Sequence, residues 1–153
     1  MRIKQIVNKL IKKHGTNDPF LIADQRHVLV YDRPLGGILG FFTANRHIPM
    51  IYLNADVTEP VHRFVCAHEL GHSVLHPHLN TPFLRQNTLF SIDRVEREAN
   101  TFGVELLMPD NELYEYRESG ITIHEVATIY GIPPELSELK SLDTYWQPLL
   151  FYT

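Results

Sequence analysis

The chain has 153 residues, of which 44% are hydrophobic and 21% charged, so its composition is that of a globular domain and excludes extended disorder. Its 14 basic and 18 acidic residues give a formal charge of -4, which excludes a basic footprint for direct nucleic-acid binding. Cys66 is the single cysteine, so an internal disulfide framework is excluded as well. We expect one cytoplasmic domain over residues 1–153, with no signal peptide and no membrane span.

The first third of the chain predicts two helices and a small sheet. Apolar residues recur at helical spacing from Ile3 to Ile11, and Asp18-Pro19 is a start signal for a short second helix. Three apolar segments separated by short turns predict strands, and the tight connections favour a mainly antiparallel three-stranded sheet. The predicted strands are residues 27–31, 38–44 and 48–53.

A longer helix is predicted over about residues 59–75. Thr58 is a candidate hydroxyl cap, Pro60 suits the first turn, and Pro77 ends the helical pattern. The pentapeptide His68-Glu69-Leu70-Gly71-His72 therefore lies in the middle of this helix. Residues 77–92 have no helical period and predict a loop that could rim a site.

The second half of the chain is predicted to be helical. A strong helix begins after Ser91 or Asp93, either of which could cap it, and is broken at Pro109. Residues 110–141 form a helical subregion, and residues 142–153 are an aromatic tail. Within the subregion the expected helices are 110–118, 122–130 and 134–141. The fold class is therefore α+β.

The pentapeptide predicts a metal site. Side chains four residues apart share one face of a helix, so His68 and His72 converge on a point. Zinc accepts neutral imidazoles in a tetrahedral shell, and catalytic zinc sites keep one position for water. Glu69 is then placed to act as a general base toward that water. A helix is the geometry that this pattern requires, and the surrounding sequence predicts one.

The predicted helix that is broken at Pro109 carries two candidates for the third metal ligand, Glu96 and Glu98. Glu96 shares a face with Asn100 and Gly103, a stripe that could approach another helix closely. Glu98 lies about 200° around the helix from Glu96 and is the less favoured ligand, expected to face solvent. Asn100 could orient a ligand histidine through its second ring nitrogen.

Two further histidines follow the pentapeptide. His78 is six residues after His72, the spacing of the third metzincin ligand, but that pattern needs a glycine where this chain has Leu75. His78 is therefore a less favoured ligand. His76 continues the ligand face by one turn and is expected to cap the helix C-terminus as a partly positive imidazole. Cys66 points away from the metal and is expected to be a buried small hydrophobe.

Two sequence blocks resemble the ImmA/IrrE family of bacterial zinc metallopeptidases. They are residues 63–76, which contain HELGH, and residues 96–109, which contain EREAN and LLMP; Asp18-Pro19-Phe20 and Gly40-Phe41 extend the likeness. The resemblance implies a zincin-like fold of the gluzincin type with zinc on His68, His72 and Glu96. It also implies cleavage of helix-turn-helix repressors that control a phage, a mobile element or a stress regulon. Gly103 replaces an expected alanine, a change that we expect to be nearly neutral, and we expect no appended sensor domain.

The predicted function is zinc-dependent endopeptidase activity with Glu69 as general base. The oxyanion also needs a donor, and several side chains are candidates: Tyr52, His78, Tyr114, His124 and Tyr130. The alternative is a non-catalytic anti-repressor that binds and sequesters the repressor using the same fold. The aromatic tail would suit such an interface, although packing back on its own domain is the favoured interpretation of the tail. Direct DNA binding by residues 122–140 is disfavoured, because its recognition helix would carry two acids and one base.

Overall fold

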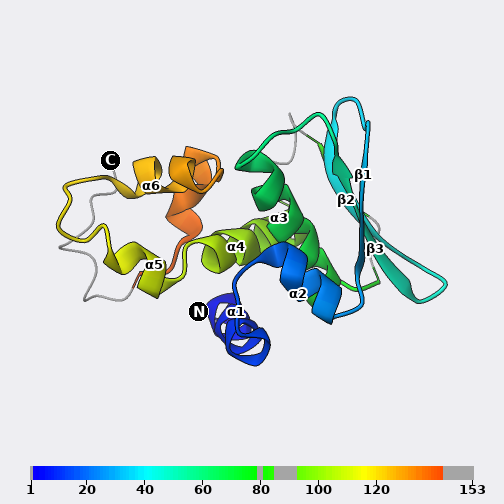
Figure 1. Ribbon diagram of the computed structural model, residues 1–153, viewed down its shortest axis with the longest axis horizontal. Coiled ribbons are helices and arrows are strands. Elements are labelled where there is room, and N and C mark those ends of the chain that lie inside the picture. Colours follow the sequence, from blue (N-terminus) through cyan, green and yellow to red (C-terminus); the bar gives the residue numbers. More distant parts are fainter. Residues whose placement is uncertain (1, 79–80, 85–92, 143–153) are drawn as a thin grey trace.

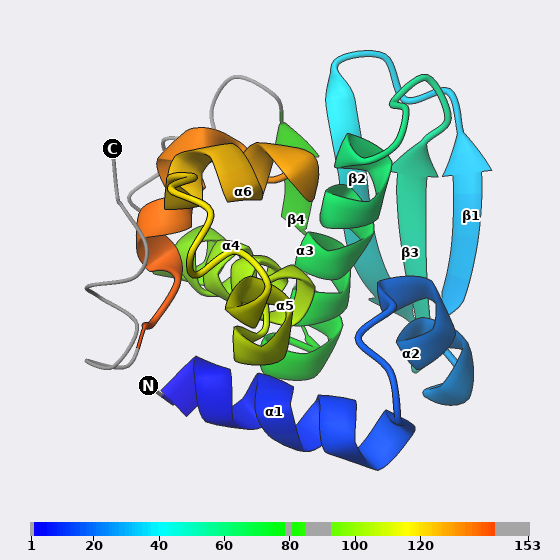
Figure 2. The same cartoon turned by 60° about the vertical axis from the view of Figure 1, so that its left-hand side comes forward.

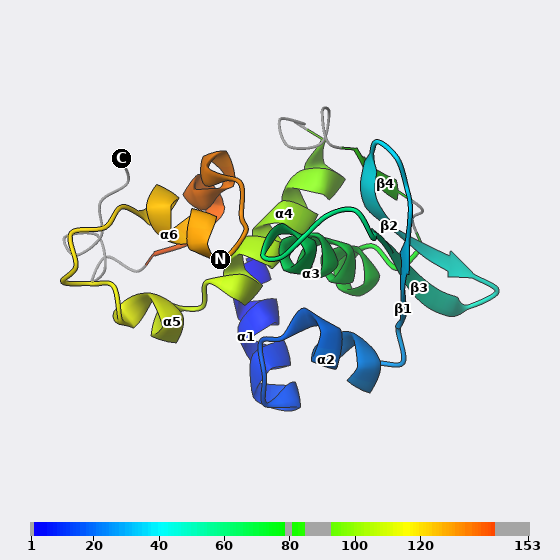
Figure 3. The same ribbon diagram turned by 45° about the horizontal axis from the view of Figure 1, so that its top comes forward.

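The computed structural model describes residues 2–78, 81–84 and 93–142. Two helices, α3 (Val61–Leu75) and α4 (Arg94–Leu107), lie in the middle of the molecule, with a sheet on one side and the C-terminal helices on the other (Figures 1 and 3). The predicted α+β class is confirmed. None of the helices in these residues is long and apolar enough to span a membrane.

The two N-terminal helices form as predicted. Helix α1 (Arg2–His14) buries Val7 and Leu10 and packs against α4. Helix α2 (Pro19–Gln25) begins at Asp18, whose carboxylate accepts a hydrogen bond of 2.9 Å from the backbone N–H of Phe20. A proline at the first helical position and an acidic cap are therefore sufficient to start this short helix.

The sheet has four strands, in the order β1-β3-β2-β4 (Figure 2). Strand β1 (Leu29–Arg33) is parallel to β3 (Ile48–Asn54), and β2 (Ile38–Asn45) is antiparallel to both β3 and β4. The three predicted strands are present and the sheet is mainly antiparallel. The count of three was wrong, because β4 (Thr81–Leu84) forms inside the segment predicted to be a loop.

Helix α3 packs between the sheet and α4, and its start differs from the prediction. The helix begins at Val61 after Pro60, and no side chain caps it. The predicted hydroxyl cap at Thr58 was wrong, since Thr58 contributes its backbone carbonyl to the N–H of His62 at 3.0 Å. Helix α4 begins as expected, with Asp93 accepting a hydrogen bond of 2.8 Å from the N–H of Val95. The other candidate cap, residue 91, lies outside the described residues.

Two glycines let α3 and α4 approach each other closely. A Cβ atom added to Gly71 would lie 3.0 Å from Cβ of Phe102, and one added to Gly103 would lie 2.9 Å from Cε2 of Phe64. Both phenylalanine rings are buried, so neither has free space to move into. The expectation that alanine would be nearly neutral at position 103 was therefore wrong.

The C-terminal subregion is helical, but its helices are shorter than predicted. They are α5 (Asp110–Tyr114), α6 (Ile123–Ile129) and a 3-10 helix, η1 (Pro134–Leu139). Thr122 and Glu125 form a capping box that starts α6, with the Glu125 N–H donating to the Thr122 hydroxyl at 3.1 Å. Of the predicted aromatic tail, residues 143–153 lie outside the described residues.

A buried ion-pair network ties this subregion to the helical core. The ammonium group of Lys140 lies 2.9 Å from Glu105 on α4 and 2.9 Å from Asp110 on α5. Asp110 also pairs with Lys4 on α1 at 3.1 Å. The side chains of Lys140 and Glu105 are 0% and 2% exposed, so water cannot replace a lost partner.

We expect Glu105→Ala to destabilise the fold by about 3 kcal/mol, because it leaves the buried ammonium of Lys140 with one carboxylate instead of two. The free energy of unfolding in urea measures this loss. Glu118→Ala is the matched control, since its side chain is 81% exposed and the change should be nearly neutral. Equal stability of the two variants would contradict a stabilising role for the network.

Candidate metal centre

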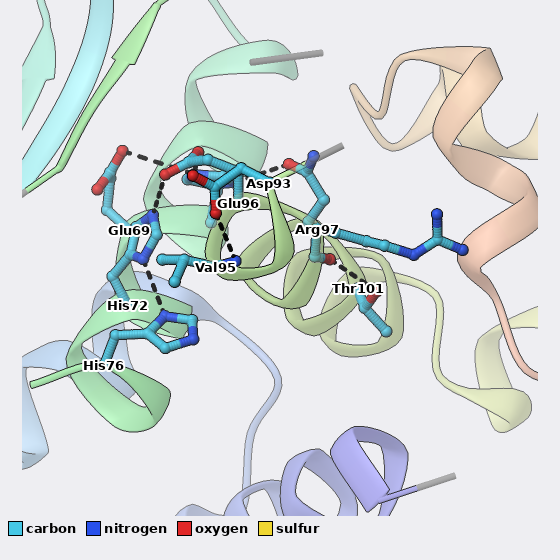
Figure 4. Close-up of polar contacts among 10 residues, drawn as sticks. Glu69, His72, His76, Asp93, Val95, Glu96, Arg97 and Thr101 are labelled. Atoms are coloured by element: carbon cyan, nitrogen blue, oxygen red, sulfur yellow. Dashed lines mark hydrogen bonds and ion pairs between the residues drawn. The ribbon is translucent and has the colours of Figure 1, made fainter. Parts of the chain in front are cut away.

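Three side chains from two helices meet at one point. On α3, Nε2 of His68 and Nε2 of His72 each lie 3.1 Å from a different carboxylate oxygen of Glu96, which comes from α4. Figure 4 shows His72 and Glu96 pointing toward each other, with Glu69 beside them. All three side chains are buried. In the part of the chain that the structure describes, this is the one set of His, Cys, Asp or Glu side chains that could hold a metal ion together.

The spacing of these atoms fits a tetrahedral zinc ion. Zinc bonds of about 2.0–2.1 Å at tetrahedral angles put neighbouring ligand atoms about 3.3 Å apart. The two observed separations of 3.1 Å are close to this value. Nε2 of His72 and both oxygens of Glu96 are buried and accept or donate no hydrogen bond within the described residues, although they lie close together. A cation at their centre would satisfy these buried atoms.

Asn100 fixes the orientation of one of the two histidines. Its side-chain oxygen lies 2.8 Å from Nδ1 of His68, in a buried contact between α4 and α3. An amide oxygen can only accept, so the imidazole carries its proton on Nδ1 and directs the lone pair of Nε2 toward the centre. The contact expected between Asn100 and a histidine is therefore present.

The charge states of the cluster suit a divalent cation. Burial lowers the pKa of His68, and the neighbouring Glu96 and Asn100 oppose this only in part. Burial would raise the pKa of Glu96, but its contacts with His68 and His72 prevail and lower it to about 2. A neutral imidazole and an ionised carboxylate are the forms that bind metals.

Glu69 has a different environment from Glu96. Its side chain is fully buried, and neither of its oxygens accepts a hydrogen bond from a described residue. Burial, reinforced by the charge of Glu96, raises the pKa of Glu69 well above its ordinary value. One of its oxygens lies 4.0 Å from Nε2 of His68. This carboxyl group is therefore placed to exchange a proton with a molecule bound at the centre.

The two less favoured ligands lie elsewhere. Glu98 is partly buried rather than solvent-facing as predicted, and its carboxylate lies 3.3 Å from Nε of Arg94. His78 is exposed and lines a separate cavity of about 400 Å³ near the β2–β3 turn. Neither belongs to the group formed by the three converging side chains.

The candidate oxyanion donors have varied surroundings. The Tyr130 hydroxyl donates to Glu112 at 2.9 Å, and burial together with this contact raises its pKa. The ring of Tyr114 lies under the guanidinium of Arg117, 3.5 Å from its centroid. Tyr52 is in strand β3. The role of oxyanion donor stays a prediction for these three tyrosines and for the other two candidates, His78 and His124.

His76 makes a contact that the sequence analysis missed. It ends α3 as predicted, but its Nδ1 lies 3.1 Å from Nδ1 of His72. Burial, followed by the charge of His72, lowers the pKa of His76, so the expectation of a partly positive imidazole was wrong. The spacing of four residues between the two histidines was the signal that could have indicated this contact.

Cys66 behaves as predicted. The side chain is fully buried in the hydrophobic core, and burial raises the pKa of its thiol far above the ordinary value. Such a thiol is a poor nucleophile and a poor metal ligand. The cysteine is therefore part of the packing of α3.

A buried HExxH helix crossed by a glutamate-bearing helix, beside a small sheet, defines a zincin-like metallopeptidase. The model of the peptidase M78 family, described as an IrrE N-terminal-like domain, matches residues 23–140. The chain belongs to the ImmA/IrrE family of metallopeptidases, as the two sequence blocks predicted.

Two curated relatives span most of the chain. It is 42% identical over 141 residues to uncharacterized immunity region protein 2 of Bacillus phage phi105, covering 92% of this chain and 89% of that protein. It is 29% identical over 141 residues to metallopeptidase ImmA of Bacillus subtilis (strain 168), covering 90% of this chain and 83% of that protein.

Proposed function

We propose that the chain is a zinc-dependent endopeptidase of the gluzincin type that hydrolyses a peptide bond in a helix-turn-helix repressor. One observation carries the catalytic part of this proposal: the buried carboxyl group of Glu69 adjoins the His68, His72 and Glu96 cluster and has no hydrogen-bond partner in the described residues. Burying such a group without a partner costs stability, which a purely structural metal site would have no reason to retain.

The residues of the chain have separate roles in this mechanism. His68, His72 and Glu96 would hold the zinc ion, which when bound supplies a Lewis acid that lowers the pKa of a water molecule and polarises the scissile carbonyl. Glu69 accepts the proton from the attacking water and later donates it to the leaving amine. Asn100 keeps the His68 imidazole in the tautomer that presents Nε2 to the ion.

The choice of substrate rests on the family. Of the two relatives, one is named for a phage immunity region and the other as a metallopeptidase. A repressor is the protein whose removal would end immunity, so its cleavage would derepress a phage, a mobile element or a stress regulon. We place the reaction in the cytoplasm, where such a repressor acts. The net charge of -4 favours contact with the repressor protein rather than with DNA.

The proposal is tested by incubating the zinc-loaded chain with candidate helix-turn-helix repressors from the same genome. We expect two fragments whose masses sum to that of the repressor plus one water molecule. A chelator should stop the reaction and added zinc should restore it. Intact repressor held in a stable complex with the zinc-loaded chain would instead support the non-catalytic anti-repressor.

A further inference from the structure

The two histidines of the HExxH motif are held by unlike partners. His68 is held through Nδ1 by the neutral side-chain amide of Asn100, a residue that is only 3% exposed. His72 is held through Nδ1 by another imidazole, that of His76, at 3.1 Å. Figure 4 shows the ring of His76 below that of His72, and His76 is the residue that directly follows the end of α3. The second partner therefore comes from the C-terminal cap of the helix that carries His72.

The direction of the hydrogen bond follows from the role of His72. A neutral imidazole that presents Nε2 to a metal carries its proton on Nδ1. His72 must then donate, and Nδ1 of His76 must accept. A neutral His76 that accepts through Nδ1 carries its own proton on Nε2. One metal-facing lone pair thus determines the tautomers of two successive rings.

The far side of His76 faces an acid. Its Nε2 lies 3.6 Å from a carboxylate oxygen of Glu98 on α4, a separation longer than a direct hydrogen bond but close enough for electrostatic attraction. That carboxylate also lies 3.3 Å from Nε of Arg94, one turn earlier on the same helix. The His76 side chain is 10% exposed and that of Glu98 is 24% exposed, so the contact is only partly screened by water.

We propose that His76, backed by Glu98, is a positioning residue that fixes the tautomer and ring orientation of His72. This inference rests on the proposed function, since it takes His72 as a metal ligand. Glu98 would act on His76 and not on the metal, because it does not belong to the metal-binding group of His68, His72 and Glu96. Partners of this kind raise the basicity of a ligand histidine, and their loss lowers metal affinity by about 10–100-fold.

The test compares zinc affinities of full-length variants, measured by competition with a chromophoric chelator. We expect His76→Phe to bind zinc about 10–100-fold more weakly than the wild type. His76→Asn should restore most of the affinity, because its amide oxygen takes the place of the accepting Nδ1, as Asn100 does for His68. Glu98→Gln, which keeps the shape of the side chain, should cause a smaller loss.

The matched control is His47→Phe, which makes the same change at an exposed histidine in the turn between β2 and β3. It should bind zinc like the wild type. Cobalt in place of zinc gives a second readout: the visible absorption spectrum should change in His76→Phe, return in His76→Asn and stay unchanged in His47→Phe. A melting temperature recorded without metal checks that the variants fold alike.

Several results would overturn the inference. One is a folded His76→Phe variant with the zinc affinity and cobalt spectrum of the wild type. Another is a folded His76→Asn variant that binds zinc as weakly as His76→Phe. In both cases the wild type would still bind zinc, so the proposed function would stand. A wild-type chain that binds no zinc would overturn the proposed function together with this inference.

Discussion

Replacing Glu69 with glutamine should leave zinc bound and lower the rate of repressor cleavage by about 10²–10⁴-fold, the usual contribution of general acid–base catalysis. The amide has nearly the same shape as the carboxylate but cannot accept the proton of the attacking water. The side chain is fully buried and lies beside the cluster rather than among its three converging atoms. Catalysis and metal binding should therefore be separable at this position.

The measurement pairs cleavage rate with zinc content for wild type, Glu69→Gln and a control, Glu118→Gln. The control removes a carboxylate whose side chain is 81% exposed, so both readouts should be unchanged. If Glu69→Gln cleaved the repressor at the wild-type rate, the assigned role would be wrong. If the same change removed zinc, Glu69 would act in metal binding instead.

Replacing Glu96 with alanine should lower zinc affinity by more than about 100-fold. A loss of about 100-fold is the most that we expect when a residue that only orients a metal ligand is removed. The change removes both oxygens that lie 3.1 Å from the two imidazoles, so two ligands remain where zinc peptidases use three. Cleavage should be lost in parallel, because Glu69 alone cannot activate the water at neutral pH.

Glu98→Ala is the matched control for Glu96→Ala, since both change a glutamate on α4. Glu98 contacts His76 and Arg94, so its loss should weaken zinc binding only modestly. Zinc affinity measured by chelator competition distinguishes the two. Wild-type affinity in Glu96→Ala, with loss of zinc in Glu98→Ala or His78→Ala, would transfer the ligand role to one of those residues.

The parts of the fold and site that follow from local periodicity could be predicted. Helical phase put His68 and His72 on one face of α3, and the same argument favoured Glu96 over Glu98 on α4. In the structure Glu96 faces both histidines, whereas Glu98 faces His76. Such inferences succeed because side-chain direction along a helix depends on sequence spacing alone.

Features that depend on tertiary contacts could not be predicted. Strand β4 has four residues, including Pro82, too few to show an alternating pattern, and it forms by pairing with β2. The steric cost of adding a side chain at position 103 depends on the position of the Phe64 ring, and local sequence patterns do not predict that position. The spacing of four residues is compatible with the contact between His72 and His76, but the position of His76 at the end of the helix equally predicts a capping role.

X-ray absorption at the zinc edge of the wild-type chain tests most directly whether His68, His72 and Glu96 hold the metal. One zinc per chain is expected, with two imidazole nitrogens at about 2.0–2.1 Å and oxygen at about 2.0–2.2 Å. The signal of one imidazole should disappear in a histidine variant that still binds zinc. A sulfur shell at about 2.3 Å, a single imidazole in the wild type, or no bound zinc would contradict this metal centre.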